Sequence, residues 1–194
     1  MLNTGYVEVD WLPRPVGEVQ LHLAINYTDQ RTIGAELLPG RSFTASQVSA
    51  LFAASHTDAT VLAAISSNGK DADLVGPFGS FPAYTVLDQL NFNDAGETTV
   101  VLGAAYDFSH LITDGLKFQA RYGMGWGVVD FLTGAPQPNQ NELNMELEYH
   151  PSSGPLKDLY FQIFYSGVRF PGAPASEENR PQLRSVVTYL VPLL

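Results

Sequence analysis

The sequence predicts an all-β fold, an antiparallel β-barrel that crosses a membrane, and three observations support this fold class. Polar and apolar residues alternate along several segments, which is typical of strands with one polar and one apolar face. The segments are roughly nine to thirteen residues long, close to the length that a tilted strand needs to cross a bilayer. The connections between them are alternately short and long.

The alternation is clearest in three segments, which span residues 19–28, 116–124 and 142–149. In the first, the odd positions are all apolar or aromatic, while most of the even positions are polar. Weaker alternation predicts further strands at residues 6–12, 47–55, 60–67, 99–108, 159–169 and 184–194. Because strands in soluble sandwiches are usually nearer five or six residues, the length of these strands, about nine in all, favours a membrane barrel.

The connections support the same fold class. Short connections are predicted at residues 13–17, 56–58, 109–115 and 151–158, and long ones at 30–44, 68–96, 128–140 and 171–182. The long connections are rich in Gly, Pro, Asn and Asp, which indicates loops and not missed helices. A barrel with tight periplasmic turns on one rim and extracellular loops on the other has this arrangement. With no helical periodicity or linker, residues 1–194 are expected to belong to a single barrel domain.

The composition excludes several classes of protein. A hydrophobic content of 45% with 15% charged residues indicates a folded chain, and the lack of a long apolar run excludes a membrane-spanning helix. Without cysteine there is no disulfide, thiolate metal site or cysteine nucleophile. A net charge of −10 makes nucleic acid an unexpected partner. The first residues, MLNTGYVEVDW, lack the features of a secretory signal, so a processed, truncated or miscalled start is expected.

The charged residues indicate which face of each strand meets water. A Lys or Arg that faces lipid costs roughly 2 to 4 kcal/mol, so Lys117 and Arg121, with Glu142, Glu146 and Glu148, are predicted to face the lumen. In a soluble barrel that holds a small apolar ligand the two faces exchange roles, and alternation alone does not separate the two cases. Aromatic residues near the strand ends favour the membrane barrel: Trp11, Tyr27, Tyr106, Phe108, Tyr122, Tyr149 and Tyr189.

The histidines give no indication of catalysis. His56, His110 and His150 lie in or next to the short connections, and His22 lies within a strand, on its polar face. None of them has a nucleophile beside it at strand spacing, which a barrel hydrolase would need. The sequence therefore predicts that the protein is not an enzyme.

Two acidic pairs are candidate ligands for a divalent cation, Asp71 with Asp73 and Glu177 with Glu178. Carboxylate oxygens are suitable ligands for such ions. The spacing matches no recognised loop motif, so solvated surface charge is the favoured interpretation. No metal and no cofactor is predicted.

Several stretches, taken in order, resemble the C-terminal half of the OprD family of outer-membrane porins. They are DQRTIGAELLPGRSF, PFGSFPAYT followed by NFNDAGE, AAYDFSHL with DGLKFQARYGMGWG, ELNMELEY, GPLKDLYFQIFYSGVR and QLRSVVTYLVPLL. The resemblance covers nearly the whole chain. It implies a monomeric barrel of about eighteen strands in the bacterial outer membrane with a water-filled passage, of which this chain would supply the second half.

The resemblance also implies a function, the passive and substrate-selective diffusion of small hydrophilic solutes such as amino acids or small carboxylates. The expected surroundings are outer-membrane lipid and lipopolysaccharide. Solutes in the family are guided by basic side chains on the barrel wall and by a constricting loop, which is expected in the N-terminal half. The pore-lining residues predicted here are Lys117, Arg121, Arg169, Arg184, Glu142, Glu146, Glu148 and His22. The acidic members, with Glu8 and Asp10, would set a transverse field across the pore; simple solvation by pore water is the alternative.

The chain departs from the family at two positions, Asp94, where Arg is usual, and Leu194, where many outer-membrane proteins end in Phe. A further alternative function is a binding or adhesion barrel with a plugged lumen. Residues 68–96 contain enough apolar side chains to fold inward or to dock a partner, namely Leu74, Val75, Phe78, Phe81 and Tyr84.

Overall fold

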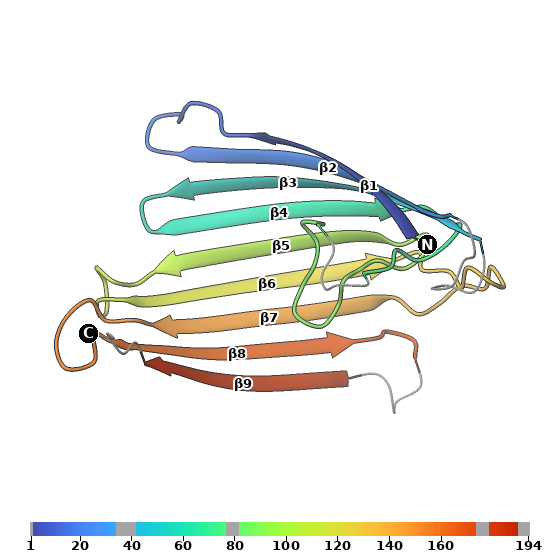
Figure 1. The fold of residues 1–194 in the computed structure, drawn as a ribbon. Coiled ribbons are helices and arrows are strands. Elements are labelled where there is room, and N and C mark those ends of the chain that lie inside the picture. The colour runs from blue at the N-terminus through green and yellow to red at the C-terminus, as the bar shows by residue number, and fades with distance from the viewer. Residues whose placement is uncertain (1, 34–41, 77–81, 174–178, 190–194) are drawn as a thin grey trace.

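The structure is a computed structural model that describes residues 2–33, 42–76, 82–173 and 179–189 of the 194-residue chain. Its strands form one antiparallel sheet in which each strand pairs with its neighbours in the sequence (Figure 1). The strands are β1 Leu2–Trp11, β2 Gln20–Thr32, β3 Thr44–His56, β4 Ala59–Asn68, β5 Thr98–Asp107, β6 Leu116–Trp126, β7 Gln140–Tyr149, β8 Leu159–Arg169 and β9 Asn179–Tyr189. Within these residues no helix is long and apolar enough to cross a membrane.

The predicted all-β antiparallel fold is confirmed, and each predicted strand has a counterpart in the sheet. The largest difference is at β9, which begins before residue 184; residues 190–194 of the predicted strand lie outside the described residues. The early part of β9 contains Pro181, which pairs with Gly167. Proline is found mostly on edge strands, and β9 is the last strand of this sheet. Because β9 starts early, the connection before it is shorter than predicted.

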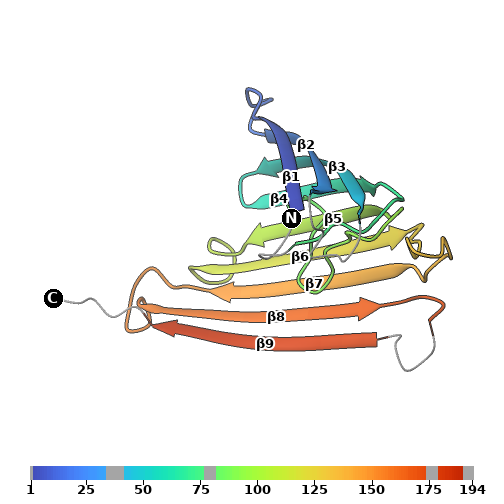
Figure 2. The ribbon, with the colours of Figure 1, turned by 45° about the vertical axis from the view of Figure 1, so that its right-hand side comes forward.

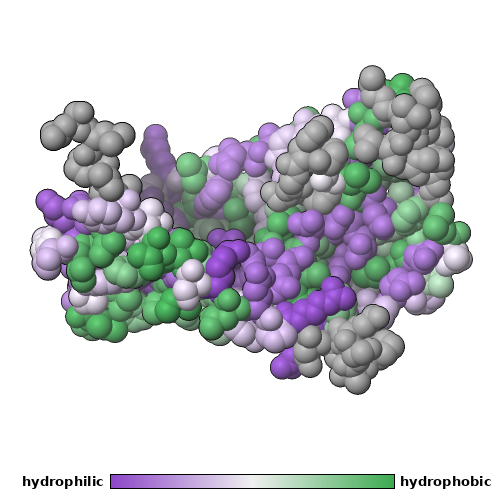
Figure 3. Space-filling view, turned by 60° about the horizontal axis from the view of Figure 1, so that its bottom comes forward, coloured by the Kyte–Doolittle hydropathy of each residue, from purple (hydrophilic) through white to green (hydrophobic). Residues whose placement is uncertain are grey.

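The register gives the sheet two different faces. Direct cross-strand partners lie on the same face, so one row runs from Asn26 through Ser49 and Ser66 to Thr99, all polar and buried. We call this polar face the inner face. The opposite, outer face carries exposed apolar and aromatic residues, including Ile25, Phe52, Ile65, Leu102, Tyr122, Ile163 and Val187. The sheet curves from β9 to β1 (Figure 2), and hydrophobic and hydrophilic residues gather in separate areas of the surface in Figure 3.

The connections fall into two groups, one at each end of the strands. We call the end with residues 12–19, 57–58, 108–115 and 150–158 the turn end, and the other the loop end. At the turn end Gly115 has a φ of 77°, and a Cβ atom there would collide with the backbone of His150, so glycine is required. At the loop end the longest connection, residues 69–97, returns over the inner face in front of the sheet (Figure 1).

The apolar core lies between the sheet and this long connection. One cluster contains Ala45, Ala72 and Leu74, and a second contains Ala64, Leu87, Phe92 and Val101. In each cluster the alanine or valine of a strand meets larger side chains of residues 69–97. The described residues of this connection, 69–76 and 82–97, are therefore packed against the inner face as part of the folded structure, and we call them the inner loop.

Candidate functional site

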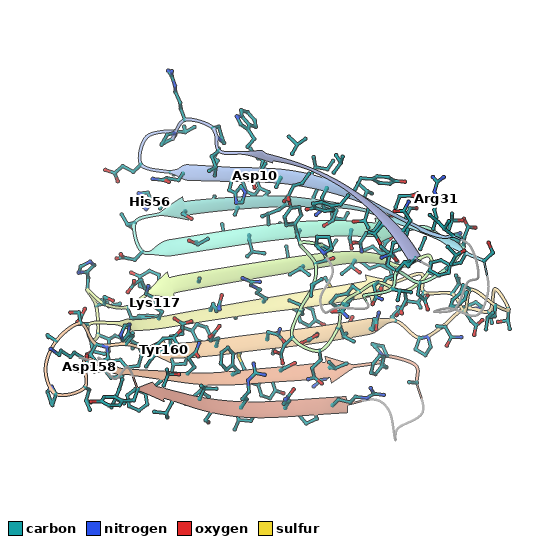
Figure 4. The ribbon with its side chains drawn as sticks, viewed as in Figure 1. Asp10, Arg31, His56, Lys117, Asp158 and Tyr160 are labelled. Carbon is teal, nitrogen blue, oxygen red and sulfur yellow. The ribbon has the colours of Figure 1, made fainter. Side chains whose placement is uncertain are left out.

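The inner face brings together most of the predicted pore-lining residues. On β6, Lys117 pairs with Glu148 of β7, and the next inner-face residue, Gln119, pairs with Glu146. Arg184 of β9 lies on the same face through its partner Phe164, which itself pairs with Glu146. His22 of β2 is also on this face, 2.8 Å from Asp10 of β1. Figure 4 shows Lys117 near the turn end of the strands and Arg31 near the loop end.

Arg169 is an exception and corrects the predicted set. It is the last residue of β8 and pairs with Asn141, so it lies on the outer face, while its neighbour Val168 is buried on the inner face opposite Glu142. The expected alternation of polar and apolar residues is thus reversed at this end of β8. The sequence alone did not predict this arrangement, because the charge of Arg169 indicated the polar face, whereas the inner-face residue beside it is the buried, apolar Val168.

The inner loop crosses the inner face through hydrogen bonds to successive strands. Gln30 of β2 makes two bonds of 2.8 Å with the backbone of Val75. Ser49 of β3 accepts the Tyr84 amide at 3.1 Å, and Thr85 donates to Ser66 of β4 at 2.8 Å. These contacts confirm that the described part of the predicted connection 68–96 folds inward; Phe78 and Phe81 lie outside the described residues. An inward loop was expected from an N-terminal half, and this chain has one of its own.

The apolar side chains of the inner loop pack on small residues of the sheet, namely Ala64, Val101 and Gly123. We call these three residues the seat of the loop. Phe92 is 1% exposed and packs, with Leu87, against Ala64 and Val101. A Cβ atom on Gly123 of β6 would lie 2.8 Å from both the Phe92 ring and the Leu87 side chain. The glycine therefore leaves the space that the two side chains fill.

The tip of the inner loop is bound to a buried carboxylate. Glu142 of β7 is 0% exposed. Its Oε1 accepts the Gln89 amide at 2.9 Å and the Ser166 hydroxyl at 2.8 Å, and its Oε2 accepts the Leu90 amide at 2.7 Å. Glu142 was predicted to line the pore, and it does lie on the inner face, but the loop covers it. Its contacts could not be expected from the sequence, because Gln89 is 53 residues away along the chain.

A second group of carboxyls lies at the base of the inner loop. The Gln140 side chain donates to Oε1 of Glu97 at 2.7 Å and to Oδ2 of Asp94 at 2.9 Å. Burial raises the pKa of Glu97 to about 7, and burial together with the nearby Asp73 raises the pKa of Asp94. Asp73 accepts the Ala95 amide at 2.7 Å. Three carboxyls, those of Asp73, Asp94 and Glu97, thus lie near one another at the base of the loop.

Metal binding has no support in the part of the chain that the structure describes, where no group of three His, Cys, Asp or Glu side chains is arranged to hold an ion. Of the acidic pairs considered from the sequence, Asp73 has a structural contact and Asp71 is exposed. Glu177 and Glu178 lie outside the described residues.

A hollow of about 300 Å³ lies between the inner loop and the wall of β6–β8. The loop contributes Val86, Leu87 and Asp88, and the wall contributes Gln119, Arg121, Asn144, Glu146 and Phe164. Arg184 lies 3.4 Å from Asp88 and stacks 4.6 Å from the Phe164 ring centre. The hollow thus offers a guanidinium group, two carboxylates and two amides to a small polar molecule.

Two further hollows continue this one toward the turn end. A hollow of about 340 Å³ shares Gln119 and Glu146 with the first and reaches Lys117 and Glu148. A third of about 580 Å³ shares Lys117 and Glu148 with the second and ends near Tyr160, which lies close to the turn end in Figure 4. The three hollows form one polar track along β6 and β7.

Basic and acidic residues are mixed along this track. Lys117 is 3.6 Å from Asp107 and directly opposite Glu148, and Arg184 is next to Asp88. The charges along this track are therefore not separated into a basic and an acidic wall. The predicted transverse field, which also involves Glu8 and Asp10 of β1, stays a prediction. Glu146 is bound on both sides by amides, those of Gln119 and Gln162.

Comparison with known proteins gives a family. A model of the family described as "outer membrane porin, OprD family" matches residues 1–193. A search of the curated proteins finds no match.

Solved structures from Pseudomonas aeruginosa share the fold. OpdK, whose structure is described as one with vanillate, is 24% identical with a TM-score of 0.86, and the alignment covers 97% of this chain and 48% of OpdK. OccK10 (OpdN) is 20% identical with a TM-score of 0.88 and coverage of 100% and 54%. OccK3 (OpdO) is 23% identical with a TM-score of 0.79 and coverage of 97% and 50%. The chain spans about half the length of these proteins, and its nine strands match half of an 18-stranded barrel.

Proposed function

Because this chain belongs to the OprD family of outer-membrane porins, we propose that it forms one side of a channel for the passive diffusion of small hydrophilic solutes. In the proposed barrel, residues 1–194 are part of a single domain, and further strands close the sheet between β1 and β9. The outer face meets the lipid and lipopolysaccharide of the outer membrane, and one barrel works as a monomer.

The observation that carries this proposal is the polar track of three successive hollows beside the inner loop. A solute that follows the track moves between charged and amide side chains from the loop end to the turn end. Each group on the track can replace part of the water that the solute loses. Apolar solutes find no such replacement and are disfavoured.

Amino acids and small carboxylates fit the groups in the first hollow. The Arg121 guanidinium can bind a carboxylate through two parallel hydrogen bonds. Asp88 and Glu146 lie on the same hollow and can accept an ammonium group. A solute with one or both of these groups would keep its hydrogen bonds in the first hollow.

A plugged barrel used for binding or adhesion is the second candidate. It is favoured by one observation, that the inner loop covers the inner face of β2–β5 through bonds to Gln30, Ser49 and Ser66. The hollows along β6 and β7 favour the channel, because the loop leaves this side of the inner face open.

Channel recordings separate the two candidates. The full-length protein that carries this chain is expected to give ohmic channels in planar bilayers that small carboxylates block. In Arg121→Gln the half-blocking concentration should rise roughly tenfold, because a hydrogen bond to a charged group is worth about 1.5 to 3 kcal/mol.

The matched control is Arg169→Gln, which removes the same charge from the outer face. Its block by carboxylates should equal that of the unsubstituted protein. A folded full-length barrel without conductance would refute the channel, and equal effects of the two substitutions would refute the role of Arg121.

A further inference from the structure

The inner loop has a buried, charged attachment at its tip. The chain turns at residues 87–90, where the Leu87 amide donates to the Leu90 carbonyl at 2.9 Å. The turn presents two consecutive amides, those of Gln89 and Leu90, to the two oxygens of the Glu142 carboxylate. The Gln89 side chain adds a bond of 2.7 Å to Ser166 of β8.

Glu142 is held in an unusual way for a buried carboxylate. Within the described residues its oxygens accept three hydrogen bonds, two from backbone amides and one from the Ser166 hydroxyl, and it forms no ion pair with a described cation. Hydrogen bonds to a charged acceptor are roughly twice as strong as those between neutral groups. If the loop moved away, the carboxylate would lose two of its three donors at once.

The attachments of the inner loop to β2–β4 and to Arg184 differ from this one. Gln30, Ser49 and Ser66 make bonds between neutral groups on β2–β4. The neighbouring ion pair of Asp88 with Arg184 is partly exposed and longer, at 3.4 Å, and such pairs contribute little. Glu142 is thus the buried charged anchor for the part of the loop that borders the first hollow.

We infer that Glu142 is a positioning residue, which sets the width of the channel by holding the turn at residues 87–90 against β7 and β8. This inference rests on the proposed function. The turn carries Leu87 and Asp88, which form the loop side of the 300 Å³ hollow. When the anchor is lost, the turn leaves the wall for part of the time, and the hollow changes width.

The test compares Glu142→Gln with Glu146→Gln in the full-length protein. Glutamine has the shape of glutamate, but its amide group would face one of the two loop amides, donor against donor, so the anchor is broken. Glu146→Gln removes the same charge from the same face of β7, where the carboxylate bonds Gln119 and Gln162 of the sheet. It therefore serves as the control for charge alone.

Two measurements are made on each variant. Amide hydrogen exchange at Gln89 and Leu90 should be roughly tenfold faster in Glu142→Gln, the effect of losing one net bond to a charged group, and unchanged in Glu146→Gln. Single-channel recordings of Glu142→Gln should show current levels that the unsubstituted protein does not visit. A third variant, Ser166→Ala, keeps the carboxylate and both amide bonds. It should give a smaller increase in exchange at Gln89 and Leu90, and it tests the anchor even if Glu142→Gln does not fold.

Equal exchange in Glu142→Gln and Glu146→Gln, or no increase in Ser166→Ala, would overturn the inference. The exchange measurement needs no ion current, so it tests the anchor even if the protein forms no channel. Absence of current in the unsubstituted protein would instead count against the proposed function.

Discussion

The two halves of the inner face differ in the side chains that they offer to the inner loop. Across β2–β5 the residues beneath the loop are small, apolar or neutral, as in the row from Ala24 through Leu51 and Ala64 to Val101. From β6 onward the inner face carries Lys117, Arg121, Glu142, Glu146, Glu148 and Arg184. The first half seats the loop and the second half leaves a polar track beside it.

The difference shows how one sheet can both hold a loop and leave space for a solute. Small side chains allow the loop to approach the strands and to bury Phe92 and Leu87, which the hydrophobic effect favours. Charged side chains need water or polar partners, so the loop meets the charged groups of this half through polar contacts, such as those with Glu142 and Arg184. The inner loop therefore packs most closely where the inner-face residues are small or neutral, and the polar track begins where they become charged.

The largest effect is expected from breaking the seat. Phe92→Ala removes a fully buried ring, and large-to-small changes of this kind cost about 3 to 5 kcal/mol. We expect most of this loss to fall on the docking of the inner loop, so proteases should cleave residues 82–97 much faster. Limited proteolysis of the folded protein measures it.

The control for this prediction is Leu102→Ala on β5. Leu102 follows Val101, which lies in the Phe92 cluster, but its own side chain is 51% exposed on the outer face. Its truncation should leave the cleavage rate unchanged. If both variants were cleaved at the same rate, the seat would not be what holds the loop.

A smaller effect is expected from pH, through the base of the inner loop. The pKa of Glu97 is about 7 when the loop is docked, against a usual value of 4.5. Below pH 4.5 both states are protonated; as pH rises toward 7 the undocked state ionises first, so docking weakens, and above 7 the loss is complete. A pKa shift from 4.5 to about 7 corresponds to at most about 3 kcal/mol in the free energy of loop docking.

Protease cleavage of residues 82–97 should therefore be slower at pH 5 than at pH 8, after correction for the protease. Glu97→Gln should remove most of this dependence, with the raised pKa of Asp94 leaving a remainder of the same sign. Asp114→Asn is the control, because Asp114 lies at the turn end and its pKa is lowered by Ser152. A dependence that survives unchanged in Glu97→Gln would contradict the prediction.

The sequence was sufficient to predict the strands and most of the inner face, because alternation with period two is a local property. It was not sufficient where a residue depends on a distant partner. Glu142 is read as an exposed pore charge until Gln89 and Leu90 are placed on it. Gly123 is read as a neutral residue until Phe92 is packed over it.

Arg169 is a second kind of case in which the sequence was not sufficient. Counting from Ile163 places it on the outer face, whereas Arg169 is among the predicted pore-lining residues. The buried Val168 beside it removes the expected contrast between the two faces. The inner loop was foreseen from its apolar content, whereas the strands on which it lies were not. Contacts over long separations were thus the missing information.

The smallest effect is expected at the turn end of the polar track. Lys117 is 57% exposed and lies 3.6 Å from Asp107, and such exposed pairs contribute little to stability. Lys117→Gln should leave loop cleavage unchanged and alter the half-blocking concentration of a carboxylate by less than about twofold, because pore water and salt screen an exposed charge. Blocking curves at low and high salt measure it, and the difference from the unsubstituted protein should shrink as salt rises. An effect as large as that of Arg121→Gln would mean that the narrow part of the channel extends to the turn end, beyond the reach of the inner loop.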